Sequence, residues 1–221
     1  MNVNDQELQV RLRDLPVFDI ELPTFDPRQA PDNPSELFVD WLLEAINAGV
    51  REPHAMTLST VDAAGRPNSR MLILKGVADG RWLFATSRES RKGQELAETP
   101  WAAASFYWSE LGRQVRIRGR VVDGGDEPSN RDFLARSEGS RAEALVGNQG
   151  RVLRDPADLE AALEEARARL ANQPELIADH WRLCHLIPDQ IEFWQADEDR
   201  RRTRLLYTLD QQTWIRELLW P

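Results

Sequence analysis

Hydrophobic positions along the chain follow two periods, one typical of helices and one typical of strands. Leu37, Trp41 and Ala45 recur at helical spacing after Pro34, which fits a first helical turn, and they predict a helix that ends near Gly49. Further helices are predicted at residues 129–135, 141–146 and 155–171. Residues 1–31 contain four prolines and no sustained period, so we expect an extended arm in front of a domain over residues 32–221.

Most of the remaining chain alternates between apolar and polar residues, as half-buried strands do. The clearest case is residues 113–122, where Val115, Ile117 and Val121 alternate with arginines, so that one side is buried and the other faces water or a ligand. Strands are predicted at residues 55–61, 69–75, 81–86, 101–108, 113–122, 181–187, 190–195 and 203–209, with 213–219 as a further candidate. Many antiparallel strands with few helices predict an α+β, mostly β, barrel.

Composition and charge narrow the classes of function. The 221 residues carry 37 acidic and 28 basic side chains, a formal net charge of −9, which weighs against nucleic-acid binding. The longest apolar run, residues 71–74, is far shorter than the ~18 residues of a membrane span. A single cysteine, Cys184 beside apolar neighbours, excludes a disulfide framework and is expected to be a buried, inert thiol. We therefore expect a cytoplasmic protein that binds neither nucleic acid nor membrane.

Cationic segments at three places could bind an anionic ligand. In residues 70–75 four apolar residues separate Arg70 from Lys75, and at ~3.3 Å per residue the two charges lie roughly 17 Å apart on opposite faces. Residues 86–92 combine hydroxyls and two cations at the start of a helix, which suits a phosphate. Residues 197–204 are rich in arginine and could clamp a carboxylate or a phosphate. In each case the alternative is a set of solvated surface charges.

The usual signatures of catalysis by side chains are missing from the sequence. His54, His180 and His185 form no ligand pattern, no Ser–His–Asp order is evident, and no glycine-rich nucleotide loop occurs. If the protein is an enzyme, a bound cofactor is expected to supply the chemistry.

Taken together, the segments resemble the pyridoxamine 5′-phosphate oxidase family of FMN-dependent oxidases. The matching pieces are residues 70–75, Ser90-Arg91-Lys92, Gly112-Arg113-Gln114-Val115, and residues 190–195 followed by Arg200 and Arg204. The resemblance implies a split β-barrel homodimer that binds one FMN in each of two clefts between the subunits. A second subunit would also explain how one ligand meets both faces of the strand at residues 70–75.

The resemblance also implies site residues. FMN contacts are expected from Arg70, Met71, Leu72, Ile73, Leu74, Lys75, Ala85, Thr86, Arg91, Lys92 and Gln114, and from Gln149, Trp194 and Arg204 of the facing subunit. Arg91 and Lys92 would hold the phosphate, and Gln114 would hydrogen-bond the isoalloxazine ring. Substrate contacts are expected from Lys75, Arg136, Ser140, Arg200 and Arg202. No side chain is expected to be catalytic, since the flavin N5 would accept hydride.

The substrate half departs from the vitamin B6 enzymes. Asp132 stands where those enzymes place a tyrosine against the substrate phosphate, and Arg202 replaces a histidine. The pattern is more similar to the flavin oxidases of phenazine biosynthesis, an antibiotic pathway. We expect an oxidase of a small aromatic anion, a reduced phenazine-type carboxylate, with O2 as acceptor. A pyridoxine/pyridoxamine 5′-phosphate oxidase and a non-catalytic flavin-binding protein stay open as alternatives.

Overall fold

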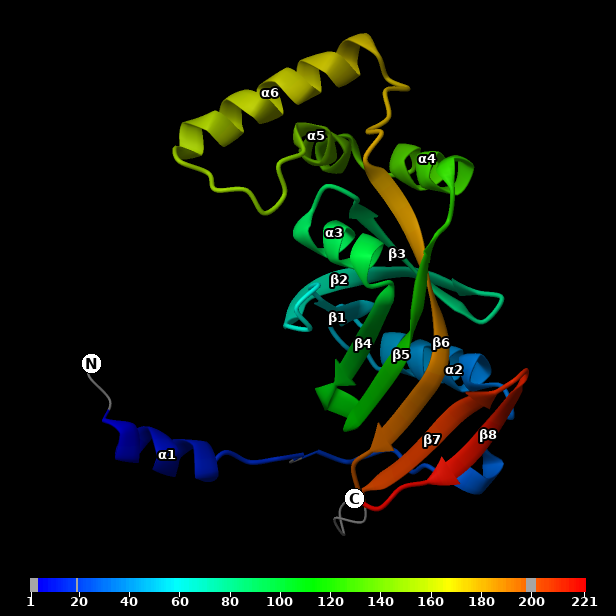
Figure 1. The fold of residues 1–221 in the computed structure, drawn as a ribbon. Coiled ribbons are helices and arrows are strands. Elements are labelled where there is room, and N and C mark those ends of the chain that lie inside the picture. Colours follow the sequence, from blue (N-terminus) through cyan, green and yellow to red (C-terminus); the bar gives the residue numbers. More distant parts are fainter. Residues whose placement is uncertain (1–3, 19, 198–201) are drawn as a thin grey trace.

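The frame of the molecule is an antiparallel sheet that closes on itself (Figure 1). The computed structural model describes residues 4–18, 20–197 and 202–221, and within them eight strands follow the order β3-β2-β1-β4-β5-β6-β7-β8. Because β3 also pairs with β6, the strands from β3 to β6 in that order form a closed barrel, and β7 and β8 extend beyond it. The strands are β1 (Ala55–Val61), β2 (Pro67–Ala78), β3 (Arg81–Ser87), β4 (Trp101–Trp108), β5 (Arg113–Asp123), β6 (Trp181–Gln195), β7 (Thr203–Asp210) and β8 (Thr213–Leu218).

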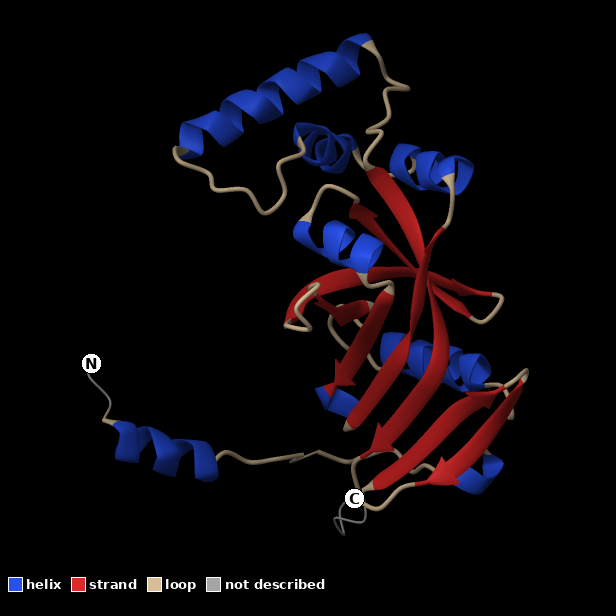
Figure 2. Cartoon of the chain, in the orientation of Figure 1, coloured by secondary structure: helices blue, strands red, loops and turns tan. Residues whose placement is uncertain are grey.

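Helices lie at the periphery of this barrel, which confirms the predicted α+β split barrel with peripheral helices. They are α1 (Asp5–Arg13), α2 (Pro34–Asn47), α3 (Arg91–Glu98), α4 (Asp126–Leu134), α5 (Glu138–Val146) and α6 (Pro156–Asn172), with short 3-10 turns at Pro27–Gln29 and Ser109–Leu111. Figure 2 shows α4, α5 and α6 at one end of the barrel and the β7–β8 hairpin at the other.

Helix α2 supplies the aromatic centre of the core. Asn33 caps it by accepting a hydrogen bond from the Ser35 amide, as expected for a helix that starts at a proline. Phe38 and Trp41 on its buried face then meet rings from the strands, with centroid separations of 5.3 Å from Phe38 to Trp82 and 5.2 Å from Trp41 to Phe193. The apolar stripe that predicted this helix is therefore the face that fills the barrel.

Two predictions about elements are wrong. The N-terminal arm is not extended throughout, because residues Asp5–Arg13 form α1, which has a capping bond from the Glu7 amide to Asn4 Oδ1 and an ion pair between Glu7 and Arg11. The two strands predicted on either side of Pro188 are a single strand, β6. The pairing with β5 shifts register between Arg118 and Gly119, opposite Pro188, and such a bulge accommodates a residue that has no N–H to donate.

Candidate functional site

The start of α3 gathers hydroxyl groups and free backbone amides in one buried place. Ser90 caps the helix, and its Oγ accepts a hydrogen bond from the Gly93 amide at 3.2 Å. Thr86 and Ser87, at the end of β3, are also buried, and the Thr86 and Ser90 hydroxyls lie 3.3 Å apart. Gly93 permits the close approach of the two elements, since a Cβ there would lie 2.4 Å from the Ser87 carbonyl oxygen. A helix start of this kind is suited to bind an anion.

Two cations, Lys92 of α3 and Arg70 of β2, lie near the start of α3. Lys92 Nζ lies 3.4 Å from Ser90 Oγ, and burial, together with the nearby charge of Arg70, lowers the pKa of Lys92. Arg70 is held by the barrel wall, because its Nη1 donates to Thr60 Oγ1 at 2.6 Å and to the Leu58 carbonyl oxygen at 3.2 Å. A bound phosphate would relieve the repulsion between two partly buried cations, so the residues present fit this group.

A buried carboxylate that sequence reasoning missed organises these cations. Glu95 accepts hydrogen bonds from Thr60, Asn68 and Arg91 at 2.5, 2.6 and 3.0 Å, and lies 3.4 Å from Arg70 Nη2. Burial alone would raise the pKa of Glu95, but the hydrogen bonds and the arginine charges outweigh it and lower that pKa. The four-residue spacing between Arg91 and Glu95 on one helix was the available sequence signal.

Strand β2 presents two different sides, as the sequence predicted. Leu74 is buried and Arg70 and Leu72 are partly buried, whereas Met71 and Ile73 are 61% and 40% exposed on the opposite side. Lys75 also lies on the exposed side. The exposed residues of this strand are therefore available to a ligand or to another subunit and not to the interior of their own barrel.

Lys75 belongs to a second group of charged residues, at the end of the barrel where α4 lies. Its Nζ lies 3.4 Å from Asp132 Oδ1, and the Trp181 indole N–H donates to Asp132 Oδ2 at 2.9 Å. The Arg136 guanidinium stacks 4.0 Å from the centroid of the Trp181 ring. Burial lowers the pKa of Arg136 against the opposing charge of Asp132, and its Nη1 has no hydrogen-bond partner among the described residues. Lys75 and Arg136 thus share one site through Asp132 and Trp181.

The polar residues predicted on the far strands form a third group. Gln114 on β5 is paired with Trp194 on β6, and Trp194 is paired with Arg204 on β7, so the three are register neighbours. Arg204 Nε donates to Glu192 Oε1 at 2.6 Å, and this hydrogen bond raises the pKa of Arg204. The Phe18 ring packs on Trp194 with centroids 5.8 Å apart. Phe18 is a further neighbour that the sequence did not point to.

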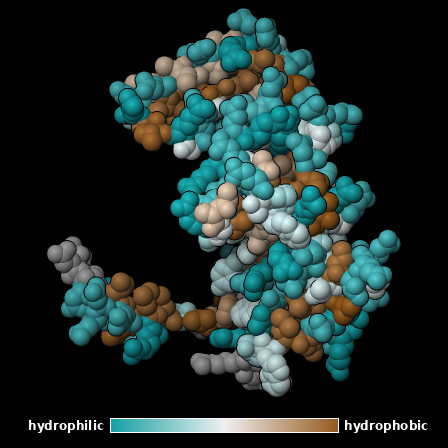
Figure 3. All heavy atoms as spheres, in the orientation of Figure 1, coloured by the Kyte–Doolittle hydropathy of each residue, from teal (hydrophilic) through white to brown (hydrophobic). Residues whose placement is uncertain are grey.

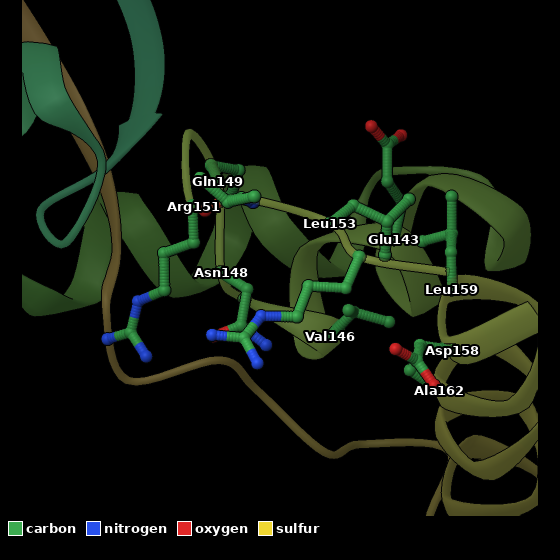
Figure 4. A pocket seen from close by; sticks show the side chains of 12 residues that line it. Glu143, Val146, Asn148, Gln149, Arg151, Leu153, Asp158, Leu159 and Ala162 are labelled. Atoms are coloured by element: carbon green, nitrogen blue, oxygen red, sulfur yellow. The ribbon is translucent and has the colours of Figure 1, made fainter. Parts of the chain in front are cut away.

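Other predicted residues lie apart from these groups. Gln149 follows α5 in a loop beside a cavity of about 480 Å³, and Figure 4 shows it close to Asn148 and Arg151. Its Oε1 is buried and has no hydrogen-bond partner in the part of the chain that the structure describes. Ser140, in the first turn of α5, accepts a hydrogen bond from Ser137. Arg202 is exposed with a φ of +40°, and Arg200 lies outside the described residues.

Cys184 is buried, as expected. The thiol is buried on β6, and burial raises its pKa to about 12. Within residues 4–18, 20–197 and 202–221, no cluster of potential metal ligands is found. In the same ranges, no helix has the length and the apolar character needed to cross a membrane.

Comparison with known proteins shows the family. Residues 42–170 match the model of the pyridoxamine 5′-phosphate oxidase family, and residues 181–221 match the pyridoxine 5′-phosphate oxidase C-terminal dimerisation region. The chain is 45% identical over 187 residues to a pyridoxine/pyridoxamine 5′-phosphate oxidase of Burkholderia thailandensis, covering 85% of this chain and 87% of that protein. It is 44% identical over 195 residues to the Ectopseudomonas mendocina protein of the same name, covering 87% and 91%.

Two solved structures share the fold of this chain. PhzG from Burkholderia lata 383, in complex with tetrahydrophenazine-1-carboxylic acid, superposes with a TM-score of 0.85 at 32% identity, covering 92% of this chain and 98% of that one. A pyridoxamine 5′-phosphate oxidase-related, FMN binding protein from Nostoc punctiforme shares the fold, with a TM-score of 0.70 at 21% identity over 89% of this chain and all of that one. The chain therefore belongs to the pyridoxamine 5′-phosphate oxidase family and is an FMN-dependent oxidoreductase.

Proposed function

We propose that this chain oxidises a reduced, phenazine-type aromatic carboxylate in phenazine biosynthesis, with O2 as the final acceptor. The observation that carries the proposal is the pairing of Asp132 with Lys75, at 3.4 Å. The complex of PhzG with a tetrahydrophenazine carboxylate, in a chain of the same fold at 32% identity, supports the substrate class.

The charge of the Asp132 site decides between ligand classes. Lys75 and Arg136 contribute two positive charges, Asp132 removes one and the charge of Glu143 also acts on Arg136, so at most about one positive charge remains for a ligand. A single carboxylate balances that charge, whereas a phosphate monoester carries about −1.5 to −2 at pH 7 and would face Asp132 uncompensated. The site therefore favours an aromatic carboxylate over a B6 phosphate.

The cofactor would be held by residues of two subunits. Arg70, Arg91, Lys92 and the start of α3 would hold the phosphate of FMN, with Ala85 and Thr86 beside it and residues 71–75 of β2 along the flavin. Gln114, and Trp194, Arg204 and Gln149 of the partner, would complete the site. The exposed side of β2 supports a contact from outside the chain. The match of residues 181–221 to a dimerisation region supports the homodimer.

The side chains bind and orient the substrate, and none needs to act as a catalytic acid or base. When bound, FMN supplies the two-electron acceptor. Arg136 would pair with the substrate carboxylate, with help from Arg200 and Arg202 where the carboxylate lies further out, and Ser140 would add a hydroxyl at the edge. Trp181 and Asp132 hold Arg136 and Lys75 in place, so the substrate meets a preorganised site.

A pyridoxine/pyridoxamine 5′-phosphate oxidase is the second candidate. The 45% identity over 187 residues to a protein of that name favours it. It requires that a phosphate bind in spite of Asp132, which is a measurable property of the site.

Asp132→Asn tests the charge argument. The amide keeps an acceptor for the Trp181 indole and removes the negative charge, so pyridoxine 5′-phosphate should bind the FMN-loaded variant roughly tenfold or more tightly. Binding is measured from the change in flavin absorbance during titration. Asp126→Asn, the same change on the same helix at a side chain paired with Arg182, is the matched control and should leave the affinity unchanged. Tight binding of pyridoxine 5′-phosphate to the unmodified protein, with no gain in Asp132→Asn, would favour the B6 enzyme.

A further inference from the structure

Helix α1 is mostly polar but carries leucines that nothing in the described chain covers. None of its residues is buried, and Leu8 and Leu12 are 49% and 60% exposed. These two leucines are spaced at i and i+4 and so form a stripe on one face of the helix, and Leu15, which is 59% exposed, follows the end of the helix. Figure 1 and Figure 3 show the arm projecting away from the barrel with apolar residues at its surface. A helix of nine residues is marginal in water on its own, so its stripe requires a packing partner.

The root of the arm is fixed to the barrel. Phe18 adopts a left-handed φ of +56° and packs its ring on Trp194 at 5.8 Å. Leu22 and Ala196 close over the backbone of Gly112, where a Cβ would lie 2.6 and 2.8 Å from their side-chain carbons. Trp194 and Ala196 belong to the segment that matches the family's dimerisation region. The arm thus leaves the molecule from the surface that is matched to subunit contact.

The charge of α1 selects the kind of partner. Asp5 and Glu7 in the first turn balance Arg11 and Arg13 in the last, so the helix has no basic face for nucleic acid or for an anionic membrane surface. A neutral helix is also not repelled by a second chain of net charge −9. Figure 1 shows the arm and the α5–α6 helices extending from the same side of the barrel, so a second chain docked on that side would face both.

From these observations we infer that the N-terminal arm packs against a second copy of this chain, with the stripe formed by Leu8 and Leu12 of α1 in contact with that copy. The arm then adds an interface to the homodimer that the C-terminal region supports, and Phe18 joins this interface to Trp194. The inference does not depend on which substrate the enzyme oxidises.

Photo-crosslinking tests whether α1 contacts its own chain or a second copy. In the full-length, FMN-loaded protein, p-benzoylphenylalanine replaces Leu12 in one copy, and the other copy carries a different affinity tag. Val10, which is 52% exposed but lies off the stripe, is the matched control position. We expect crosslinks between the two copies from position 12, at least fivefold more than from position 10. Crosslinks within one chain, equal yields at both positions, or no crosslinks would overturn the inference.

A second measurement uses the dimer itself. Leu8→Glu together with Leu12→Glu should raise the dimer dissociation constant roughly tenfold or more, because two apolar side chains leave a packed interface. Val10→Glu should leave the constant unchanged, and sedimentation velocity at a series of concentrations measures it. Neither change touches the core, so all variants should fold and keep FMN. Equal dissociation constants for the double variant and the unmodified protein would contradict the inference.

Discussion

At the scale of single residues, the binding chemistry of the site follows from which charges are buried. Lys92 and Arg91 are adjacent in the sequence but differ in surroundings. Arg91 has a side chain 65% exposed and is paired with Glu95, whereas Lys92 is partly buried beside Ser90 and Arg70, with a lowered pKa. Among the described residues no carboxylate pairs with Lys92, and hydroxyl groups lie close to it, so a phosphate would engage this cation most strongly.

Lys92→Ala should therefore weaken FMN binding more than Arg91→Ala. Loss of a charge-assisted hydrogen bond at a partly buried position costs about 1.5–3 kcal/mol, or roughly ten- to a hundredfold in affinity. Arg91 is exposed and its charge is already paired with Glu95, so its loss should change the affinity only a few-fold. Fluorescence quenching of FMN titrated with each apoprotein measures both constants. A larger loss from Arg91→Ala would contradict this ranking and make Arg91 the main contact of the phosphate.

Glu95 should make the apoprotein sensitive to acid. Its pKa in the folded protein lies below the ordinary value of 4.5, so the stabilisation is complete above pH 4.5 and is lost as the pH falls through the folded-state pKa. Glu95→Gln removes this dependence, and the difference in unfolding free energy between the two proteins should shrink from pH 7 to pH 3. Urea denaturation at a series of pH values measures it. A difference that is constant over this range would mean that Glu95 does not titrate as described.

At the scale of elements, the approach of β5 to β6 rests on one glycine. A Cβ on Gly119 would lie 2.1 Å from the Ile187 carbonyl oxygen, at the register shift opposite Pro188. Gly119→Ala must displace the backbone of β6 and should lower the free energy of unfolding by about 2–3 kcal/mol.

Gly139→Ala is the matched control for this change. Gly139 lies in α5, and a Cβ added there would meet no atom within 4 Å, so alanine should be neutral or should stabilise the protein by about 0.5–1 kcal/mol. Thermal and urea unfolding compare the two variants. Equal effects of the two substitutions would show that the β5–β6 contact is looser than described.

The elements that the sequence predicted well are those with a buried periodic face. The stripe of Leu37, Trp41 and Ala45 and the alternation in residues 113–122 both correspond to burial, so the predictions of α2 and β5 are confirmed. Pro188 wrongly predicted a break in the strand, because the sequence does not show the bulge opposite Gly119. Helix α1 was missed because nine exposed residues, stabilised by a cap and an ion pair, leave only a short periodic pattern.

The site was predictable where its chemistry is local. Ser90, Arg91 and Lys92 are adjacent at a helix start, and that pattern points to an anion without knowledge of the fold. Asp132 stands out in the sequence only as a departure from the family. Its pairing with Lys75 depends on the packing of α4 against β6, where Trp181 donates to Asp132, and no local pattern contains that packing. The buried acceptor role of Glu95 likewise depends on Thr60 and Asn68, which come from other elements.

At the scale of the whole molecule, the residues proposed to contact one flavin form three groups in different places on the chain. The Lys92 group lies at the start of α3, the Lys75–Asp132 group at the α4 end of the barrel, and the Gln114–Trp194–Arg204 group on the far strands. A homodimer, supported by the C-terminal match, would let two subunits contribute to each site. The substrate preference would depend on the complete site of the dimer. It therefore has to be tested on the dimer with FMN bound.

Anaerobic reduction of the bound FMN by each candidate substrate is the most direct test of the proposed function. The FMN-loaded protein is mixed without oxygen with a dihydro- or tetrahydrophenazine carboxylate, or with pyridoxine 5′-phosphate, and the visible absorbance of the flavin is followed; free FMN at the same concentration gives the background. We predict rapid bleaching by the reduced phenazine carboxylate, recovery of colour in air, and weak or no bleaching by pyridoxine 5′-phosphate. Rapid bleaching by micromolar pyridoxine 5′-phosphate, with no response above background to the reduced phenazines, would contradict the proposed function.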